Sequence, residues 1–252
     1  MTPELDTADR RLHLLQVWSG VLFALFLTVH LTNLAVATLG AARYDEVQTG
    51  LRRAYQSPVL ELVLVLGPLL VHAAAGALRL LRRVRAAPVA APSWRTRLHR
   101  WSGAVLLVFF LGHVTATRGA SALYGVFPRF EGVAFTLRWV PAYFWPYYTL
   151  FALAGLVHLV LGLPVALSLL GLRASALRKP AVAGTLIAFG ALLLVLGLLS
   201  IGGVFFDVGH PERGPYAQLL VKLGVAHLEP AGPAPRRAPS TPTAASGEEA
   251  PR

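Results

Sequence analysis

Four histidines, one in each of four strongly apolar segments, are the residues of this chain whose type and spacing could do chemistry. They form two matched pairs. His30 and His113 each follow the glycine of a Trp-Ser-Gly triplet by ten residues, and His72 and His158 each precede a glycine by one helical turn. A titratable ring inside a bilayer is costly and indicates a functional site. Two like pairs predict two bis-histidine sites, which is how a helical bundle holds b-type haem.

Glycines stand at matched offsets from these four predicted iron ligands. A porphyrin edge needs close approach to a helix backbone, which a glycine permits. A single glycine is better explained by helix packing in the membrane, but four at matched offsets favour haem packing. They are Gly20, Gly103, Gly76 and Gly162.

The composition is that of an integral membrane protein. The 252 residues are 55% hydrophobic and only 14% charged, with a mean hydropathy of +0.59, whereas about a quarter of the residues in a soluble domain are charged. The chain has no cysteine, which excludes disulfides, cysteine-ligated iron–sulfur clusters, thiolate haem ligation and covalent haem attachment. Any redox centre here must therefore be held by histidine.

The net charge of +11 suits either nucleic acid or a membrane surface. The arginines cluster in short connections between apolar segments, without the interleaved aromatic residues of a single-strand binding groove. This placement favours membrane lipid and argues against nucleic acid as a partner.

Five apolar segments are long enough, or nearly so, for the roughly 20 residues that cross a hydrocarbon core. We therefore predict an all-α integral membrane protein whose first four helices form a haem-binding bundle, within a domain of residues 1–206. The Pro/Ala-rich segment 207–252 is expected to be a disordered tail. The first apolar segment is too long for a cleavable signal peptide. The five segments are 14–39, 58–81, 101–118, 144–171 and 181–206.

Lysine and arginine concentrate in the connections at 82–100 and 173–179, which places these loops and the N-terminus in the cytoplasm. At 1.5 Å per residue, His30 lies roughly 24 Å along the first helix from its inner end. His113 has a similar depth on the parallel third helix, while His72 and His158 lie past the midpoints of two inward-running helices. Depth therefore pairs His30 with His113 on an outer haem and His72 with His158 on an inner one.

Two further histidines, His13 and His99, end matched Arg-Leu-His triplets just before the Trp-Ser-Gly motifs. The first arginines of these triplets, Arg11 and Arg97, could pair with haem propionates or with anionic lipid. A simple role as positively charged anchors at the cytoplasmic edge is about as well supported.

The order of these motifs resembles the membrane-anchor cytochrome b subunit of succinate dehydrogenases and fumarate reductases, in its single-chain, five-helix, di-haem form. The resemblance covers the first four helices. It includes Leu60-Glu61 with Pro68 before His72, and Thr117-Arg118 after His113. The segments that carry it are RLHLLQVWSGVLFALFLTVHL, LELVLVLGPLLVHAAAGALRLL, HRWSGAVLLVFFLGHVTATR and LFALAGLVHLVLGL.

The resemblance implies an electron-transfer subunit of a bacterial cytoplasmic-membrane complex, without carboxylate chemistry of its own. It would hold two haems b, dock a flavoprotein and an iron–sulfur protein on its cytoplasmic face, and react with a membrane quinone, for which menaquinone suits a two-haem anchor. Candidate quinone residues near the outer haem are Asp45, Glu46 and Glu61, although Glu61 also suits a helix N-terminus. Some family members carry a glutamate two residues before the fourth histidine, where this chain has Leu156.

Two other classes of protein remain open from the sequence. A different membrane cytochrome b, such as the haem subunit of a hydrogenase or a formate dehydrogenase, shares histidine-ligated haems in a helical bundle. A transporter or scaffold whose histidines are structural would bind no haem, and it has little support because few other charges lie inside the apolar segments.

Overall fold

The computed structural model describes residues 7–85 and 91–227, and this part of the chain is helical without strands. Five helical stretches are long and apolar enough to cross a membrane, so the expected all-α, multi-pass architecture is confirmed. The third is longer than predicted and begins seven residues before Trp101. The five spans are Thr7–Leu39, Pro58–Arg82, Trp94–Tyr124, Pro141–Leu169 and Pro180–Ile201.

Local sequence signals mark where several spans begin. The Ser57 hydroxyl accepts from the Leu60 amide at 3.3 Å, with Pro58 at the first helical position. The Ser93 hydroxyl accepts from the Thr96 amide in the same way at 3.3 Å. Both are N-caps, which satisfy amides that have no partner in the first turn. The long helices are α1 (Thr7–Val36), α4 (Gly67–Arg85), α5 (Trp94–Val114), α8 (Pro141–Leu169) and α9 (Pro180–Ile201).

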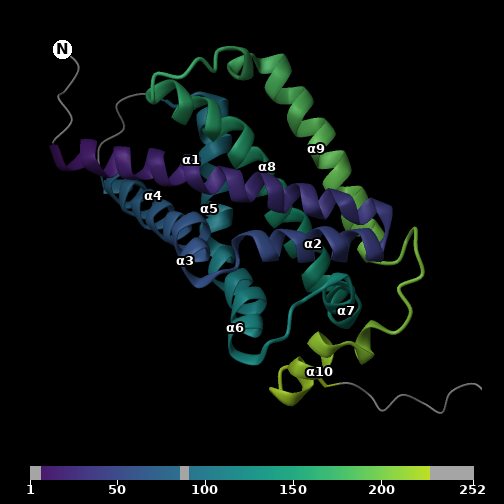
Figure 1. Cartoon of the computed structure of the whole chain (residues 1–252). Coiled ribbons are helices and arrows are strands. Elements are labelled where there is room, and N and C mark those ends of the chain that lie inside the picture. Colours follow the sequence, from purple (N-terminus) through teal and green to yellow (C-terminus); the bar gives the residue numbers. More distant parts are fainter. Residues whose placement is uncertain (1–6, 86–90, 228–252) are drawn as a thin grey trace, which may run out of the picture.

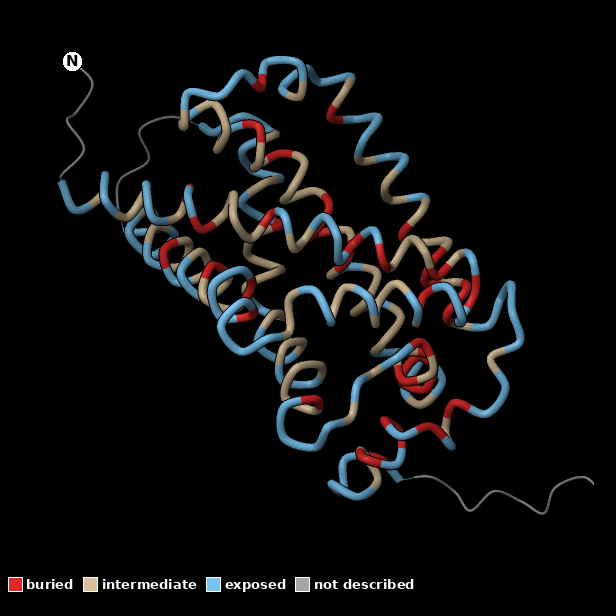
Figure 2. Tube along the Cα trace, viewed as in Figure 1, coloured by how far each residue is buried: buried red, intermediate tan, exposed pale blue. Residues whose placement is uncertain are grey.

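The bundle is organised around two helix pairs (Figure 1). Helix α1 packs on α4, α5 packs on α8, and α1 joins the pairs by also packing on α8. Helix α9 lies outside them against α1 and α8. The outward faces of the long helices are largely exposed (Figure 2), as expected of helices that meet lipid.

Two spans contain a short π-helical segment. In the second span, η2 (Leu62–Leu66) follows the four-residue helix α3 (Pro58–Glu61). In the third, η3 (Thr115–Gly119) joins α5 to α6 (Ala120–Tyr124). Such segments occur frequently at functional sites, and here they lie at the same end of the bundle.

That end, where α1 finishes, is covered by α2 (Ala41–Tyr55) and α7 (Phe130–Trp139), and we call it the capped end. Tyr44 of α2 and Phe130 of α7 are buried in one cluster with Ile201, the last residue of α9. The Asp45 carboxylate accepts from the Phe130 amide at 3.0 Å, which ties the two covering helices together. The opposite end, where α1 and α5 begin, carries the arginine-rich connections and is called the basic end.

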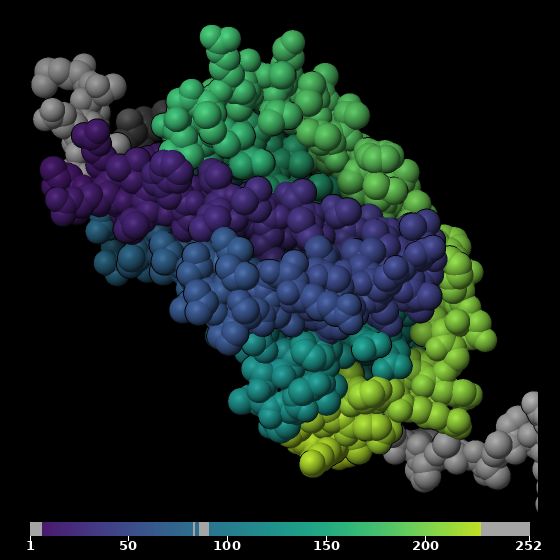
Figure 3. All heavy atoms as spheres, in the orientation of Figure 1, coloured from purple at the N-terminus to yellow at the C-terminus, as the bar shows by residue number. Residues whose placement is uncertain are grey.

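The segment 207–252 is not wholly the disordered tail that composition predicted. Its first part forms η5 (Pro211–Arg213) and α10 (Pro215–Lys222). Ala217 and Ala226 are buried against Phe135 of α7. This apolar contact stabilises a helix of eight residues, which is too short to be stable alone. Figure 3 shows α10 filling the capped end beneath α6 and α7. Residues 228–252 lie outside the described part of the chain.

Candidate functional site: two facing histidine pairs

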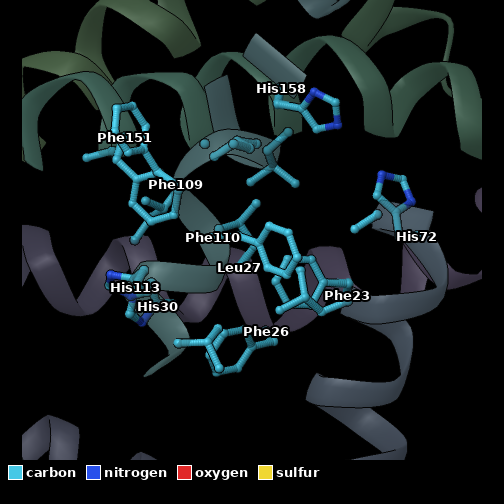
Figure 4. Close-up of a pocket in the computed structure, with 18 of the residues that line it drawn as sticks. Phe23, Phe26, Leu27, His30, His72, Phe109, Phe110, His113, Phe151 and His158 are labelled. Atoms are coloured by element: carbon cyan, nitrogen blue, oxygen red, sulfur yellow. The ribbon is translucent and has the colours of Figure 1, made fainter. Parts of the chain in front are cut away.

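The four apolar-segment histidines meet in the two pairs that their depth predicted (Figure 4). The ring centroids of His30 and His113 are 5.9 Å apart at the capped end. Those of His72 and His158 are 6.0 Å apart nearer the basic end. Each pair joins one ring from the α1–α4 side to one from the α5–α8 side. Phe110, Leu27 and Phe23 lie between the pairs.

The Trp-Ser-Gly triplets position the second pair rather than the first. In each triplet the tryptophan is exposed on the outer face and the serine is buried. A Cβ added at Gly20 would lie 2.7 Å from the His72 ring, and one at Gly103 would lie 2.9 Å from the His158 ring. These glycines therefore let an imidazole lie directly against the backbone of the facing helix. The spacing along each helix associates Gly20 with His30 and Gly103 with His113. In the folded chain the two glycines instead contact His72 and His158.

Each imidazole of the second pair has its Nδ1 atom held by a backbone carbonyl. His72 Nδ1 lies 2.9 Å from the Gln16 carbonyl oxygen, and His158 Nδ1 lies 3.2 Å from that of His99. In the first pair, His113 Nδ1 lies 3.2 Å from the Tyr147 hydroxyl, and Phe26 stacks on His30. An Nδ1–H that donates to an oxygen leaves the lone pair on Nε2, which is how a metal-binding histidine is usually oriented.

A single cavity of about 1270 Å³ contains all four histidines in its lining. It exceeds the roughly 300–1,000 Å³ of an ordinary ligand pocket. His30 lies inside a membrane-spanning helix and is among the residues that line this cavity. The cavity wall is mostly aliphatic and aromatic. Between its two ends, the imidazoles are therefore the main nitrogen atoms that could bind a metal ion.

These residues fit two bis-histidine haem sites. Two imidazoles bound to one metal ion at about 2.0 Å have their centroids about 6 Å apart, which is close to both measured separations. The donor set is also the one that haem needs, since each site offers two imidazoles in apolar surroundings. A structural zinc site usually gathers three or four protein ligands. Within residues 7–85 and 91–227, no three His, Cys, Asp or Glu side chains come together in this way.

No protein-family model, curated protein or solved structure matches this chain. The case for its function therefore depends on the geometry of the two pairs and on the groups around them.

The other two glycines of the predicted set face polar side chains at the basic end. A Cβ at Gly76 would lie 3.1 Å from Gln16 Nε2, and one at Gly162 would lie 2.5 Å from His99 Nε2. The His99 ring also stacks on His158, with centroids 4.2 Å apart. All four glycines thus allow close approach to the cavity-lining groups, two of them to imidazoles of the second pair.

The predicted propionate partners Arg11 and Arg97 are exposed and do not line the cavity. Other arginines from three different segments line it at the basic end. Arg79 donates to the Gln16 side chain, and Arg95 Nη1 donates to the Arg178 carbonyl at 2.7 Å. The sequence does not indicate which arginines line the cavity, because the rotation of each helix decides which of several neighbouring arginines points inward. The cavity-lining arginines at this end are Arg79, Arg95, Arg100 and Arg178.

Of the three candidate quinone carboxylates, only Glu61 lines the cavity. Its side chain is 6% exposed and binds the Arg118 guanidinium through both oxygens, with Nη2–Oε2 at 2.7 Å. Asp45 instead caps α7, and Glu46 pairs with Arg43 on the surface at 2.8 Å. Tyr55 lies next to this ion pair, and burial raises the pKa of its phenol, with the Glu61 carboxylate adding to the effect.

Tyr147 is a site residue that the sequence analysis did not single out. It lies eleven residues before His158, which is three helical turns and therefore the same face of α8. This spacing could have placed it near a histidine pair in advance. Its partner His113 is on another span, so the contact itself depends on how α5 packs against α8.

We expect Gly20→Ala and Gly103→Ala to disturb the His72–His158 pair and to spare the other pair. The new methyl groups would lie within 3 Å of imidazole atoms of His72 and His158, so that both rings would have to shift. In a chain whose two histidine pairs each hold one haem, the haem content should fall toward one per chain, as measured by the pyridine haemochrome assay. Gly184→Ala is the matched control, because nothing lies within 4 Å of its added Cβ. Full haem content in both site variants would contradict this account.

Proposed function

We propose that this chain is the membrane-anchor cytochrome b subunit of a succinate:quinone oxidoreductase. In this role it binds two haems b and connects an iron–sulfur subunit to quinone in the membrane. The proposal depends on one observation: one largely apolar cavity contains two histidine pairs. Within these pairs the ring centroids are 5.9 Å and 6.0 Å apart. When bound, the haems supply one-electron carriers at two depths of the bundle.

The residues of the chain supply the binding and orientation. His72 and His158 hold the haem near the basic end, and His30 and His113 hold the one near the capped end. The carbonyls of Gln16 and His99 and the hydroxyl of Tyr147 fix the imidazole orientations. Aromatic and aliphatic side chains form most of the wall around both sites.

The proposed orientation places the N-terminus and the basic end in the bacterial cytoplasm, since arginine-rich connections stay on that side. The basic end is then the surface on which a flavoprotein and an iron–sulfur subunit dock. The pair His72–His158 becomes the inner site and the pair His30–His113 the outer one. Quinone, of the menaquinone type, reacts near the capped end, where Glu61 lines the cavity.

The first test is a dithionite-reduced minus air-oxidised visible spectrum of the purified full chain, with haem quantified. The proposal predicts b-type absorbance and two haems per chain. A protein without haem after haem-replete expression would contradict it and favour a non-haem membrane protein.

A second measurement separates this family from other membrane cytochromes b. The complex solubilised from membranes of the native host and purified through a tag on this chain should retain a flavoprotein. It should either oxidise succinate with quinone as the electron acceptor or reduce fumarate with quinol as the electron donor. A di-haem preparation that instead carries a hydrogenase or formate dehydrogenase activity would keep the haem sites and overturn the succinate assignment.

A further inference from the structure

We propose that Tyr216, in the C-terminal helix α10, is a positioning residue for His113 and makes the C-terminal segment part of the outer histidine site. The inference rests on the proposed function only where it is tested by measurements on bound haem. Its structural basis is a path of contacts from α10 through the π-helical segment η3 to the histidine pair.

Tyr216 is held firmly in place at the capped end. It is 6% exposed, and its ring packs over Gly132 of α7, where an added Cβ would lie 3.1–3.2 Å from Tyr216 atoms. The neighbouring Ala217 is fully buried against Phe135. The tyrosine also lines the large cavity, as do Leu220 and Val225 of the same segment.

The Tyr216 hydroxyl donates to the Ala116 carbonyl of η3 at 3.2 Å, across 100 residues of sequence. A π-helical turn departs from the regular α-helical ladder of backbone hydrogen bonds, and the Tyr216 hydroxyl gives the Ala116 carbonyl a donor from outside the helix. The tyrosine therefore supplies a hydrogen bond at the point where the third span departs from α-helical geometry.

This π-helical segment begins two residues after His113. The Thr117 hydroxyl donates a hydrogen bond to the His113 carbonyl at 2.7 Å, which links the segment directly to the histidine. The same segment carries Arg118, which binds Glu61 on the second span. The Tyr216 hydroxyl thus acts on the stretch of backbone that sets both the direction of the His113 ring and the position of the ion pair.

The test is Tyr216→Phe, which keeps the packed ring and removes only the hydroxyl. Hydrogen–deuterium exchange of the full chain should show faster exchange in a peptide covering 113–120, by about 2- to 10-fold for one neutral hydrogen bond. In the haem-loaded protein, the electron paramagnetic resonance signal and midpoint potential of the outer haem should change. The inner haem serves as an internal reference and should not change.

Two further variants control for general disturbance. Gly132→Ala should move the Tyr216 ring from the opposite side and reproduce the effects of Tyr216→Phe. Tyr124→Phe removes the hydroxyl of a tyrosine that is 49% exposed and should leave exchange and both haem signals as in the parent.

Unchanged exchange at 113–120 together with two unchanged haem signals would overturn the inference, as would equal changes at both haems. If the chain binds no haem, the proposed function fails, and the inference is decided separately in the haem-free protein. There, exchange at 113–120 and carbethoxylation of His113 by diethyl pyrocarbonate should both be faster in Tyr216→Phe, and parental rates would overturn it.

Discussion

Under the proposed function, replacing His72 with alanine is expected to reduce the haem content from two per chain to one, and to leave the other haem spectrally intact. A haem at this site would lose one of the two protein imidazoles that would hold it, and so would bind more weakly. His158→Ala should give the same result, because the two rings face each other across 6.0 Å. His30→Ala and His113→Ala should remove the other haem instead. A redox titration of the haem absorbance would then show one step in place of two.

The double variants test the pairing itself. His72→Ala/His158→Ala should retain one haem and match either single variant, since both changes act on one site and their effects are not additive. His72→Ala/His113→Ala should lose both haems. His210→Ala is the control, because His210 is exposed, pairs with Glu212 and does not line the cavity. Loss of both haems in a folded His72→Ala protein would contradict two independent sites.

Removing the Glu61 carboxylate is expected to lower the free energy of unfolding by about 2 kcal/mol, because the partly buried Arg118 guanidinium loses its ion-pair partner. Glu61→Ala in detergent should therefore unfold at a lower temperature or lower denaturant concentration than the parent. The side chains of this pair are 6% and 31% exposed. The surface pair Arg43–Glu46 is 67% and 66% exposed, and Glu46→Ala should change stability by less than about 1 kcal/mol.

A double variant separates the unpaired charge from other causes. Glu61→Leu/Arg118→Leu removes both charges and should recover most of the stability lost in Glu61→Ala, since an apolar pair is tolerated where a lone buried charge is not. If the double variant is as unstable as the single one, the loss comes from packing rather than from the ion pair.

The depth of each histidine was predictable because it follows from simple geometry. A helix rises 1.5 Å per residue, and successive spans alternate in direction, so position along a span gives depth. This reasoning paired His30 with His113 and His72 with His158, and the folded chain brings the same rings together. The site residues beyond the four histidines were predicted less well. Arg11 and Arg97 are exposed and do not line the cavity, whereas Arg79 and Arg95 do.

Apolar length and charge placement depend only on local composition, so the sequence predicts a multi-pass α-helical membrane protein with five spans, although two of the spans begin markedly earlier than predicted. The sequence also determined which histidines share a depth. The tertiary structure alone decided that Gly20 and Gly103 accommodate the His72 and His158 rings, that Glu61 meets Arg118, and that Tyr216 reaches η3. These contacts join residues far apart in the chain, and they depend on the rotation and packing of whole helices, which no local pattern specifies.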